Sequence, residues 1–193
     1  MTDRIAFQGE PGAYSHEACR DARPDMEALP CHTFEEVIEA VRSGAAKLAM
    51  LPVENTTYGR VADIHRLLPE SGLRIIDEAF VRVHISLMAL PGTRLDALEK
   101  VRAHLVLIPQ AASFLEKYGI KGEAYADSAG AAAELSRTRD RTTGVLASDL
   151  AAEIYGLEIL ARHIEDHAHN TTRFLIMAPQ ADLTRRGEHG MMT

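Results

Sequence analysis

The sequence predicts an α/β fold of two lobes, and three features of its 193 residues carry that prediction. Short apolar runs alternate with helix-like segments, which is typical of mixed, largely parallel sheets with helices on both faces. A β-rich stretch at residues 73–90 is too long for one flat strand, so it indicates two strands or one crossing between lobes. Polar loops at residues 9–12 and 54–60 directly follow predicted strands, where ligands bind in such folds.

The expected strands and helices follow one another in the order that such a fold requires. Strands are predicted at residues 4–8, 47–53, 103–107, 123–126, 144–147 and 172–177. Helices are predicted from residue 14, at 33–44, ending near 68, at 95–100 and 109–118, from 127, and at 148–155. Thr33 and Glu36 have the spacing of a capping box, and Gly156 is placed to end the helix before it.

Composition excludes several classes of function. The net charge of −7 disfavours a general nucleic-acid binder, which normally has a basic face. Two cysteines, Cys19 and Cys31, are expected to be reduced thiols of a cytosolic protein. The chain starts with a strand-like run rather than a signal peptide, and no apolar run approaches the roughly 18 residues of a membrane helix. We therefore expect a cytoplasmic protein without nucleic-acid or membrane partners.

Two polar segments are candidate binding sites. Residues 7–15 form a strand, a glycine turn and a helix start, and free backbone N–H groups at a helix start suit a carboxylate or a phosphate. This segment lacks the glycine spacing of a dinucleotide loop and the lysine of a P-loop, so a plain turn remains an alternative. Residues 52–59 supply neutral amide and hydroxyl donors, and their alternative is a solvated loop.

Two further segments lie near the end of the chain. At residues 170–174 a polar loop becomes a strand, where Thr172 offers a hydroxyl and Arg173 a fork of donors for a carboxylate. A strand edge with a surface arginine is the alternative. Residues 163–169 contain three histidines and two acids, but no cysteine or second ligand cluster accompanies them. We interpret this run as a solvated connection and predict no metal site.

Taken in order, five segments of the chain resemble the prephenate dehydratase family. They are residues 9–15, 52–59, 125–132, 147–157 and 172–174, and the match extends from Ile5 to Ala178. The resemblance implies a fold like that of type 2 periplasmic binding proteins, with the active site in the cleft between the lobes of a homodimer. Lobe one would comprise residues 1–76 with 172–178, and lobe two residues 77–171. Because the family commonly continues into an ACT regulatory domain, residues 179–193 are expected to be a linker in a truncated chain.

The resemblance also implies a reaction, the cofactor-free conversion of prephenate to phenylpyruvate, water and carbon dioxide in phenylalanine biosynthesis. By analogy Thr172 and Arg173 are catalytic. The residues expected to bind substrate are Ser15, Glu54, Asn55, Thr56, Gln110, Asn170 and Phe174. Because loss of the two groups makes the ring aromatic, we expect Thr172 to act as a positioned hydrogen-bond donor rather than as a strong acid.

One departure from the family pattern affects this prediction. The family often has Ser-His-Pro-Gln where this chain has Ala103-His104-Leu105-Val106, so a serine that commonly contacts substrate is replaced by Ala103, whereas Gln110 is kept. Two alternatives stay open: the same chemistry on arogenate, and a non-catalytic module of the same fold that binds a small anion.

Overall fold

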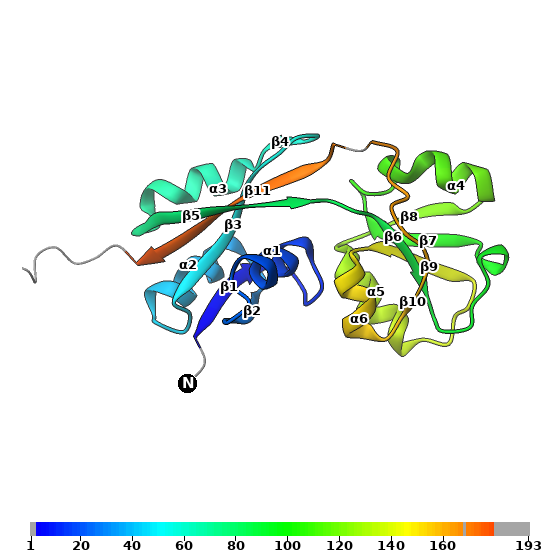
Figure 1. Cartoon of the computed structure of the whole chain (residues 1–193), viewed down its shortest axis with the longest axis horizontal. Coiled ribbons are helices and arrows are strands. Elements are labelled where there is room, and N and C mark those ends of the chain that lie inside the picture. The colour runs from blue at the N-terminus through cyan, green and yellow to red at the C-terminus, as the bar shows by residue number, and fades with distance from the viewer. Residues whose placement is uncertain (1–2, 168, 180–193) are drawn as a thin grey trace, which may run out of the picture.

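The computed structural model describes residues 3–167 and 169–179, which form two α/β lobes side by side (Figure 1). The first sheet has the strand order β2-β1-β3-β11-β5 with β4 paired to β3, and the second has the order β10-β6-β9-β7-β8. Parallel pairs join β1 to β2 and β3, and β7 to β8 and β9, whereas the remaining pairs are antiparallel. The predicted class, two α/β lobes with mixed sheets, is confirmed.

The first lobe contains the strands β1 (Arg4–Gln8), β2 (Glu27–Cys31), β3 (Leu48–Asn55), β4 (Gly59–Arg60), β5 (Leu73–Arg82) and β11 (Thr171–Pro179). Its helices are α1 (Tyr14–Ala22), α2 (Phe34–Arg42), α3 (Ala62–Leu67) and the 3₁₀ turn η1 (Leu68–Glu70). The second lobe contains the strands β6 (Ser86–Ala89), β7 (Lys100–His104), β8 (Lys121–Tyr125), β9 (Thr143–Ala147) and β10 (Glu158–Ala161). Its helices are α4 (Ala112–Tyr118), α5 (Ser128–Arg137) and α6 (Asp149–Tyr155), with the 3₁₀ turns η2 (Leu95–Ala97) and η3 (Pro109–Ala111).

Strand β1 shows how the apolar pattern builds the first lobe. Its three central residues are fully buried, because successive side chains of a strand point to opposite faces and both faces are covered. Ile5 and Phe7 pack with residues of α1, whereas Ala6 packs with residues of α2. The helices therefore cover both faces of this sheet, as the sequence predicts.

Two extended crossings connect the lobes. The β-rich stretch is two strands, β5 in the first sheet and β6 in the second, and the chain returns between β10 and β11. Residue 76, the expected boundary, lies inside β5, so the first crossing comes only after Arg82. Backbone hydrogen bonds join the crossings, from Val83 N to Asn170 O at 2.8 Å and from Ile164 N to Ile85 O at 3.0 Å.

Several local predictions need correction. Strands β2 and β10 were not predicted, residues 95–97 form only a 3₁₀ turn, and β7 ends at His104, where residues 103–107 were expected. The polar loop at 54–60 is partly a β3–β4 hairpin. The capping box is confirmed, since Thr33 Oγ1 accepts from Glu36 N at 3.1 Å, although the Glu36 carboxylate accepts from His32 N at 2.8 Å.

Two expectations concern the chain beyond these elements. None of the helices in residues 3–167 and 169–179 has the length and apolarity needed to cross a membrane. Pro179 is the last residue of β11, and the rest of the predicted linker, residues 180–193, lies outside the described residues.

Candidate active site

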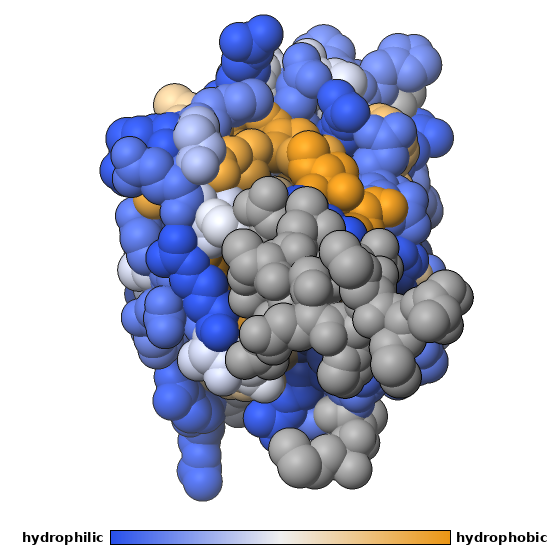
Figure 2. Space-filling view, turned by 90° about the vertical axis from the view of Figure 1, so that its left-hand side faces the viewer, coloured by the Kyte–Doolittle hydropathy of each residue, from blue (hydrophilic) through white to orange (hydrophobic). Residues whose placement is uncertain are grey.

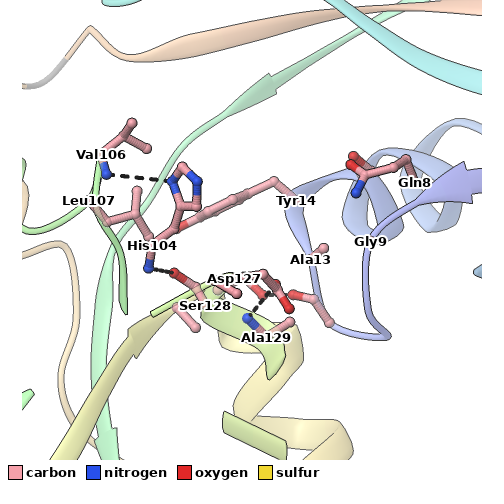
Figure 3. Close-up of a pocket in the computed structure, with 15 residues that line it drawn as sticks. Gln8, Gly9, Ala13, Tyr14, His104, Val106, Leu107, Asp127, Ser128 and Ala129 are labelled. Atoms are coloured by element: carbon pink, nitrogen blue, oxygen red, sulfur yellow. Dashed lines mark hydrogen bonds between the residues drawn. The ribbon is translucent and has the colours of Figure 1, made fainter. Parts of the chain in front are cut away.

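A cavity of about 270 Å³ lies between the two lobes, and junctions between strands and the helices that follow them supply its walls (Figure 3). The first lobe contributes the β1–α1 turn, from Gln8 to Ser15. The second lobe contributes residues after β7 and at the starts of α5 and α6. The complete lining is residues 8, 9, 12–15, 104, 106, 107, 126–129, 147 and 148. The predicted cleft between lobes, at the ends of strands, is therefore present.

The starts of α5 and α1 differ in how their backbone amides are used. At α5 the amides of Ala129 and Gly130 donate to the carboxylate of Asp127, at 2.9 and 2.8 Å. At α1, by contrast, the amides of Tyr14 and Ser15 donate to no acceptor within the described part of the chain. Unsatisfied N–H groups at a helix start attract anions. The start of α1, which includes the predicted Ser15, is thus a position in the cavity that suits a carboxylate.

The glycine turn also joins the two lobes. A Cβ atom at Gly12 would lie 2.8 Å from Ala151 Cα in α6, and Gly12 has a φ of +94°. The hydroxyls of Ser148 and Tyr155 donate to the carbonyl oxygens of Gly12 and Pro11, at 2.6 and 2.8 Å. Only glycine tolerates both this conformation and this approach, so the turn positions the α1 start against the second lobe.

A chain of side-chain amides connects several strand ends, although Asn55, Gln110, Asn170 and Thr172 are not themselves among the residues that line the cavity. Thr172 at the start of β11 pairs with Asn55 at the end of β3. The Asn55 amide nitrogen donates to Thr172 Oγ1 at 2.9 Å and to Asn170 Oδ1 at 2.7 Å. Its carbonyl oxygen accepts from the backbone amides of Thr57 and Tyr58 at 2.9 and 3.0 Å. Asn55 is therefore held on both sides, and its orientation fixes the position of the Thr172 oxygen.

The same chain continues into the second lobe. Asn170 Nδ2 donates to Gln110 Oε1 at 2.5 Å, and both side chains are almost completely buried. Gln110 Nε2 donates to Val106 O at 2.7 Å and to Tyr58 Oη at 3.1 Å. Since Val106 also lines the cavity, the amide chain reaches the cavity wall. Of the predicted site residues, the structure brings Asn55, Gln110, Asn170 and Thr172 into one network.

Thr172 is the member of this network with hydrogen-bonding capacity to spare. A hydroxyl has one donor hydrogen and two acceptor lone pairs. Its oxygen accepts from Asn55, and within residues 3–167 and 169–179 no group accepts its hydrogen. Its side chain is partly exposed. The geometry thus presents Thr172 as a donor directed by Asn55.

Four predicted site residues are not part of this arrangement. Arg173 is half-exposed and pairs with Glu78 of β5 at 2.7 and 2.9 Å. Phe174 is buried in the core of the first lobe, on the same face of β11 as Thr172. Glu54 is exposed, and Thr56 Oγ1 donates to the carbonyl of His169 and accepts from an adjacent backbone amide. Alternation along β11 directs Arg173 and Thr172 to opposite faces of the sheet, so the structure does not bring these two side chains together.

Other residues belong to the site although the sequence did not single them out. Tyr14 packs against the cores of both lobes and donates its hydroxyl to His84 O at 2.8 Å, and burial raises its pKa well above the usual range. Ser128 accepts from the His104 amide at 3.0 Å on the opposite wall. The position of the serine that commonly contacts substrate, Ala103, is fully buried in the second lobe's core and outside the cavity lining.

Comparison with known proteins places this architecture in a family. The family model described as prephenate dehydratase matches residues 5–182. A bifunctional N-acyl-homoserine lactone acylase/prephenate dehydratase of Komagataeibacter europaeus is 50% identical, over 89% of this chain and 61% of that protein. Arogenate dehydratase 1 of Petunia hybrida is 41% identical, over 95% of this chain and 44% of that protein.

Solved structures agree with these sequence matches. The prephenate dehydratase of Arthrobacter aurescens, in complex with L-Phe, has a TM-score of 0.84 and 26% identity to this chain. The similarity covers 92% of this chain and 60% of that one. The chain therefore spans about half of the lengths of the curated relatives it matches, up to 61% for the Komagataeibacter protein.

Proposed function

The chain belongs to the prephenate dehydratase family, and we propose that it converts prephenate to phenylpyruvate, water and carbon dioxide. The observation that carries this proposal is the Thr172 hydroxyl, which Asn55 orients and whose hydrogen has no acceptor among the residues that the structure describes. Prephenate carries a ring hydroxyl opposite a carboxylate, and loss of both makes the ring aromatic. The protein then needs to hold the dianion and to assist the departing oxygen, and a fixed hydrogen-bond donor suits that task.

The free amides at the start of α1 support a position for the substrate. We assign one carboxylate of prephenate to the N–H groups of Tyr14 and Ser15, where the helix dipole adds to the attraction. The ring hydroxyl then accepts from Thr172, and the carbon–oxygen bond breaks as the ring carboxylate leaves as carbon dioxide. One proton is taken up to form water, and the donor is restored from solvent. Because both ends of the substrate are then held, its reacting groups are oriented, and orientation of this kind increases the reaction rate.

Arg173 has a different role in this proposal from the catalytic one implied by family analogy. Its guanidinium is paired with Glu78 on the face of the sheet opposite Thr172. We therefore propose that it holds β11 against β5, and that Phe174 anchors the same strand in the core. Both residues would position Thr172 rather than contact prephenate.

A direct assay tests the proposal. The purified chain is given prephenate, and phenylpyruvate formation is followed together with substrate binding by calorimetry. Turnover that is lost in Thr172→Ala supports the assignment. Binding without turnover in the wild-type chain would instead support the non-catalytic module. Arogenate, the substrate class in the name of the Petunia relative, is assayed beside prephenate, and the ratio of kcat/KM values decides between them.

The name of the Komagataeibacter relative favours a second candidate, deacylation of N-acyl-homoserine lactones. Three serines line the cavity, Ser15, Ser128 and Ser148. A serine nucleophile usually pairs with a histidine ring, and within the described residues no serine hydroxyl does so. The Ser148 hydroxyl hydrogen is also already used, because it is donated to the Gly12 carbonyl oxygen. An assay for released homoserine lactone, with Thr172→Ala as a variant that should not affect it, separates this activity from dehydration.

We also propose that the chain forms a homodimer in the cytoplasm. Strand β5 is an edge strand, and Ile75, Ile76 and Phe80 on it are 57%, 44% and 61% exposed. Figure 2 shows an apolar patch on the end of the molecule where β5 begins. Exposed apolar patches and long free strand edges favour association. Analytical ultracentrifugation of the wild-type chain and of Phe80→Glu tests this, since the substitution should shift the species towards the monomer.

A further inference from the structure

Both interlobe crossings bring three potential metal ligands together, away from the cavity lining. His84 lies between β5 and β6, and His163 and Glu165 lie between β10 and β11. The ligand atoms of all three fall within 4.8 Å of one another. His84 Nδ1 is 2.8 Å from Glu165 Oε1 and 2.8 Å from His163 Nδ1, and the last two atoms are 3.9 Å apart.

His84 Nδ1 takes part in two of these contacts, and a neutral ring nitrogen cannot satisfy both as hydrogen bonds. A neutral imidazole nitrogen has either one hydrogen to donate or one lone pair to accept with. If His84 Nδ1 donates to Glu165, it has no lone pair for His163. If it accepts from His163 instead, the Glu165 oxygen faces a lone pair. A cation between the three atoms would satisfy all of them, since each then offers a lone pair.

The backbone around this cluster holds the ligands in place. Glu165 Oε2 accepts from Ile85 N at 2.9 Å, and the glutamate side chain is only 6% exposed. The neighbouring Ile164 N donates to Ile85 O at 3.0 Å. The carbonyl of His84 accepts from Tyr14 Oη at 2.8 Å. Metal sites depend on such outer contacts to orient their ligands, and here they exist on both crossings.

His163 adds an independent observation. Its φ of +53° is the one positive φ of a non-glycine residue in the described part of the chain. Such a conformation is strained for a non-glycine residue and persists where the surroundings or a function require it. It directs the ring at His84, with centroids 4.3 Å apart. Both histidines are partly open to solvent, which leaves a path for an ion and a position for water.

We propose that His84, His163 and Glu165 bind a divalent transition metal, with Zn²⁺ as the probe of choice. Two imidazoles and one carboxylate suit Zn²⁺ better than Mg²⁺ or Ca²⁺, which prefer all-oxygen sites. Tetrahedral ligands at about 2.0 Å from zinc lie about 3.3 Å apart, a value between the present separations of 2.8 and 3.9 Å. Water completes the coordination, and the ion ties together the two crossings on which any movement of the lobes depends.

The proposed site differs from the sequence-based interpretation of residues 163–169 as a solvated connection without a metal. No further ligand follows or precedes that run closely in the sequence. The third ligand is His84, which is 79 positions away from His163 along the chain. The remaining histidines of the run, His167 and His169, are exposed and lie outside the cluster. The proposal is independent of the proposed function, because it concerns binding at the crossings.

The test is a Zn²⁺ titration of the full chain, without an affinity tag and after treatment with a chelator. Competition with a chromophoric chelator gives affinity and stoichiometry, and Co²⁺ gives a visible spectrum that reports tetrahedral coordination. We expect one ion per chain and a higher Tm with Zn²⁺. His163→Ala should weaken binding by at least about 10- to 100-fold, the loss produced by removing even an outer contact.

Two further variants sharpen the result. Glu165→Gln can still accept from Ile85 N and should also weaken binding. His167→Ala, an exposed histidine of the same run, should bind as the wild type does. Circular dichroism of each variant checks that it is folded. Equal affinity in the wild-type chain and His163→Ala, or an equal loss in His167→Ala, would overturn the proposal whatever the chain does with prephenate.

Discussion

The side-chain nitrogen of Asn55 lies 2.9 Å from the hydroxyl oxygen of Thr172, across the antiparallel pair of β3 and β11. This contact uses an acceptor lone pair of the threonine and leaves its hydrogen free to point elsewhere. A weak acid becomes a useful donor only if its orientation is fixed before the substrate arrives. The contact with Asn55 therefore determines how well Thr172 can donate to a substrate.

Thr172→Ala should lower kcat for prephenate by roughly 10²-fold or more, because a positioned donor contributes about that factor. Thr172→Ser keeps the hydroxyl and should recover most of the rate. Thr171→Ala changes the preceding residue of β11 and is the matched control. Stopped assays of phenylpyruvate and circular dichroism are the measurements. A folded Thr172→Ala protein with unchanged turnover would refute the assignment.

Asn55→Asp should be nearly as damaging although it preserves shape. The aspartate still accepts from the amides of Thr57 and Tyr58, so the turn after β3 is retained. It cannot donate to Thr172, whose hydroxyl would instead donate to the new carboxylate and be lost to the substrate. We expect kcat to fall by about 10²-fold. A variant that keeps wild-type kcat at neutral pH would show that the Asn55 donor is dispensable.

Arg173→Ala should reduce kcat far less than Thr172→Ala, because the arginine pairs with Glu78 on the other face of the sheet. An exposed ion pair is worth about 0–1 kcal/mol, so stability should change little. Glu78→Ala is the matched control, and the two variants should behave alike. If Arg173→Ala abolishes turnover while Glu78→Ala does not, the arginine contacts substrate after all.

The sequence predicted the interior of both lobes better than their edges. Strands β1 and β9 carry short, completely buried apolar runs, residues 5–7 and 145–147, that predict them directly. Strand β2 was missed because it lies at a sheet edge, has no fully buried residue and contains Pro30, which is unusual inside a strand. Residues 103–107 contain an apolar run, but its second half turns back towards η3 instead of extending β7.

The site was predicted only in part for a similar reason. Residue type identified Asn55 and Thr172 as donors, but their contact depends on the register between β3 and β11, which a sequence does not display. Alternation along β11 assigns Arg173 to the opposite face, and that distinction needs the sheet. The cluster of His84, His163 and Glu165 depends on two crossings that lie side by side, which no local pattern reveals.

Gly12→Ala should weaken the contact between the lobes. Its new methyl group would meet Ala151 in α6 at 2.8 Å, besides the strain of a positive φ. Gly44→Ala is the control, because Gly44 also has a positive φ but nothing within 4 Å of an added Cβ. Strain alone costs about 1–2 kcal/mol, so urea denaturation should show a larger loss for Gly12→Ala. Equal losses would mean that the lobes adapt without cost.

Stability should fall as pH rises from about 4.5 to about 7, because the partly buried carboxyl of Glu17 has a raised pKa in the folded protein. Burial in α1, together with nearby Asp21, raises the pKa of Glu17 from 4.5 to about 7. Across that interval the unfolded chain loses this proton before the folded chain does, so ionisation favours unfolding. Glu17→Gln removes this dependence. The free energy of unfolding of Glu17→Gln should therefore increase relative to that of the wild type by about 1 kcal/mol for each pH unit between pH 4.5 and pH 7.

Urea denaturation at several pH values measures this difference, with Glu116→Gln on the surface of α4 as the control for loss of one carboxylate. The difference between wild type and Glu17→Gln should be small near pH 4, grow through the window and stay constant above pH 7. The backbone amide of Leu150 in α6 acts in the opposite direction and lowers the pKa of Glu17. A difference that does not change between pH 4 and pH 8 would mean that Glu17 is solvated in solution.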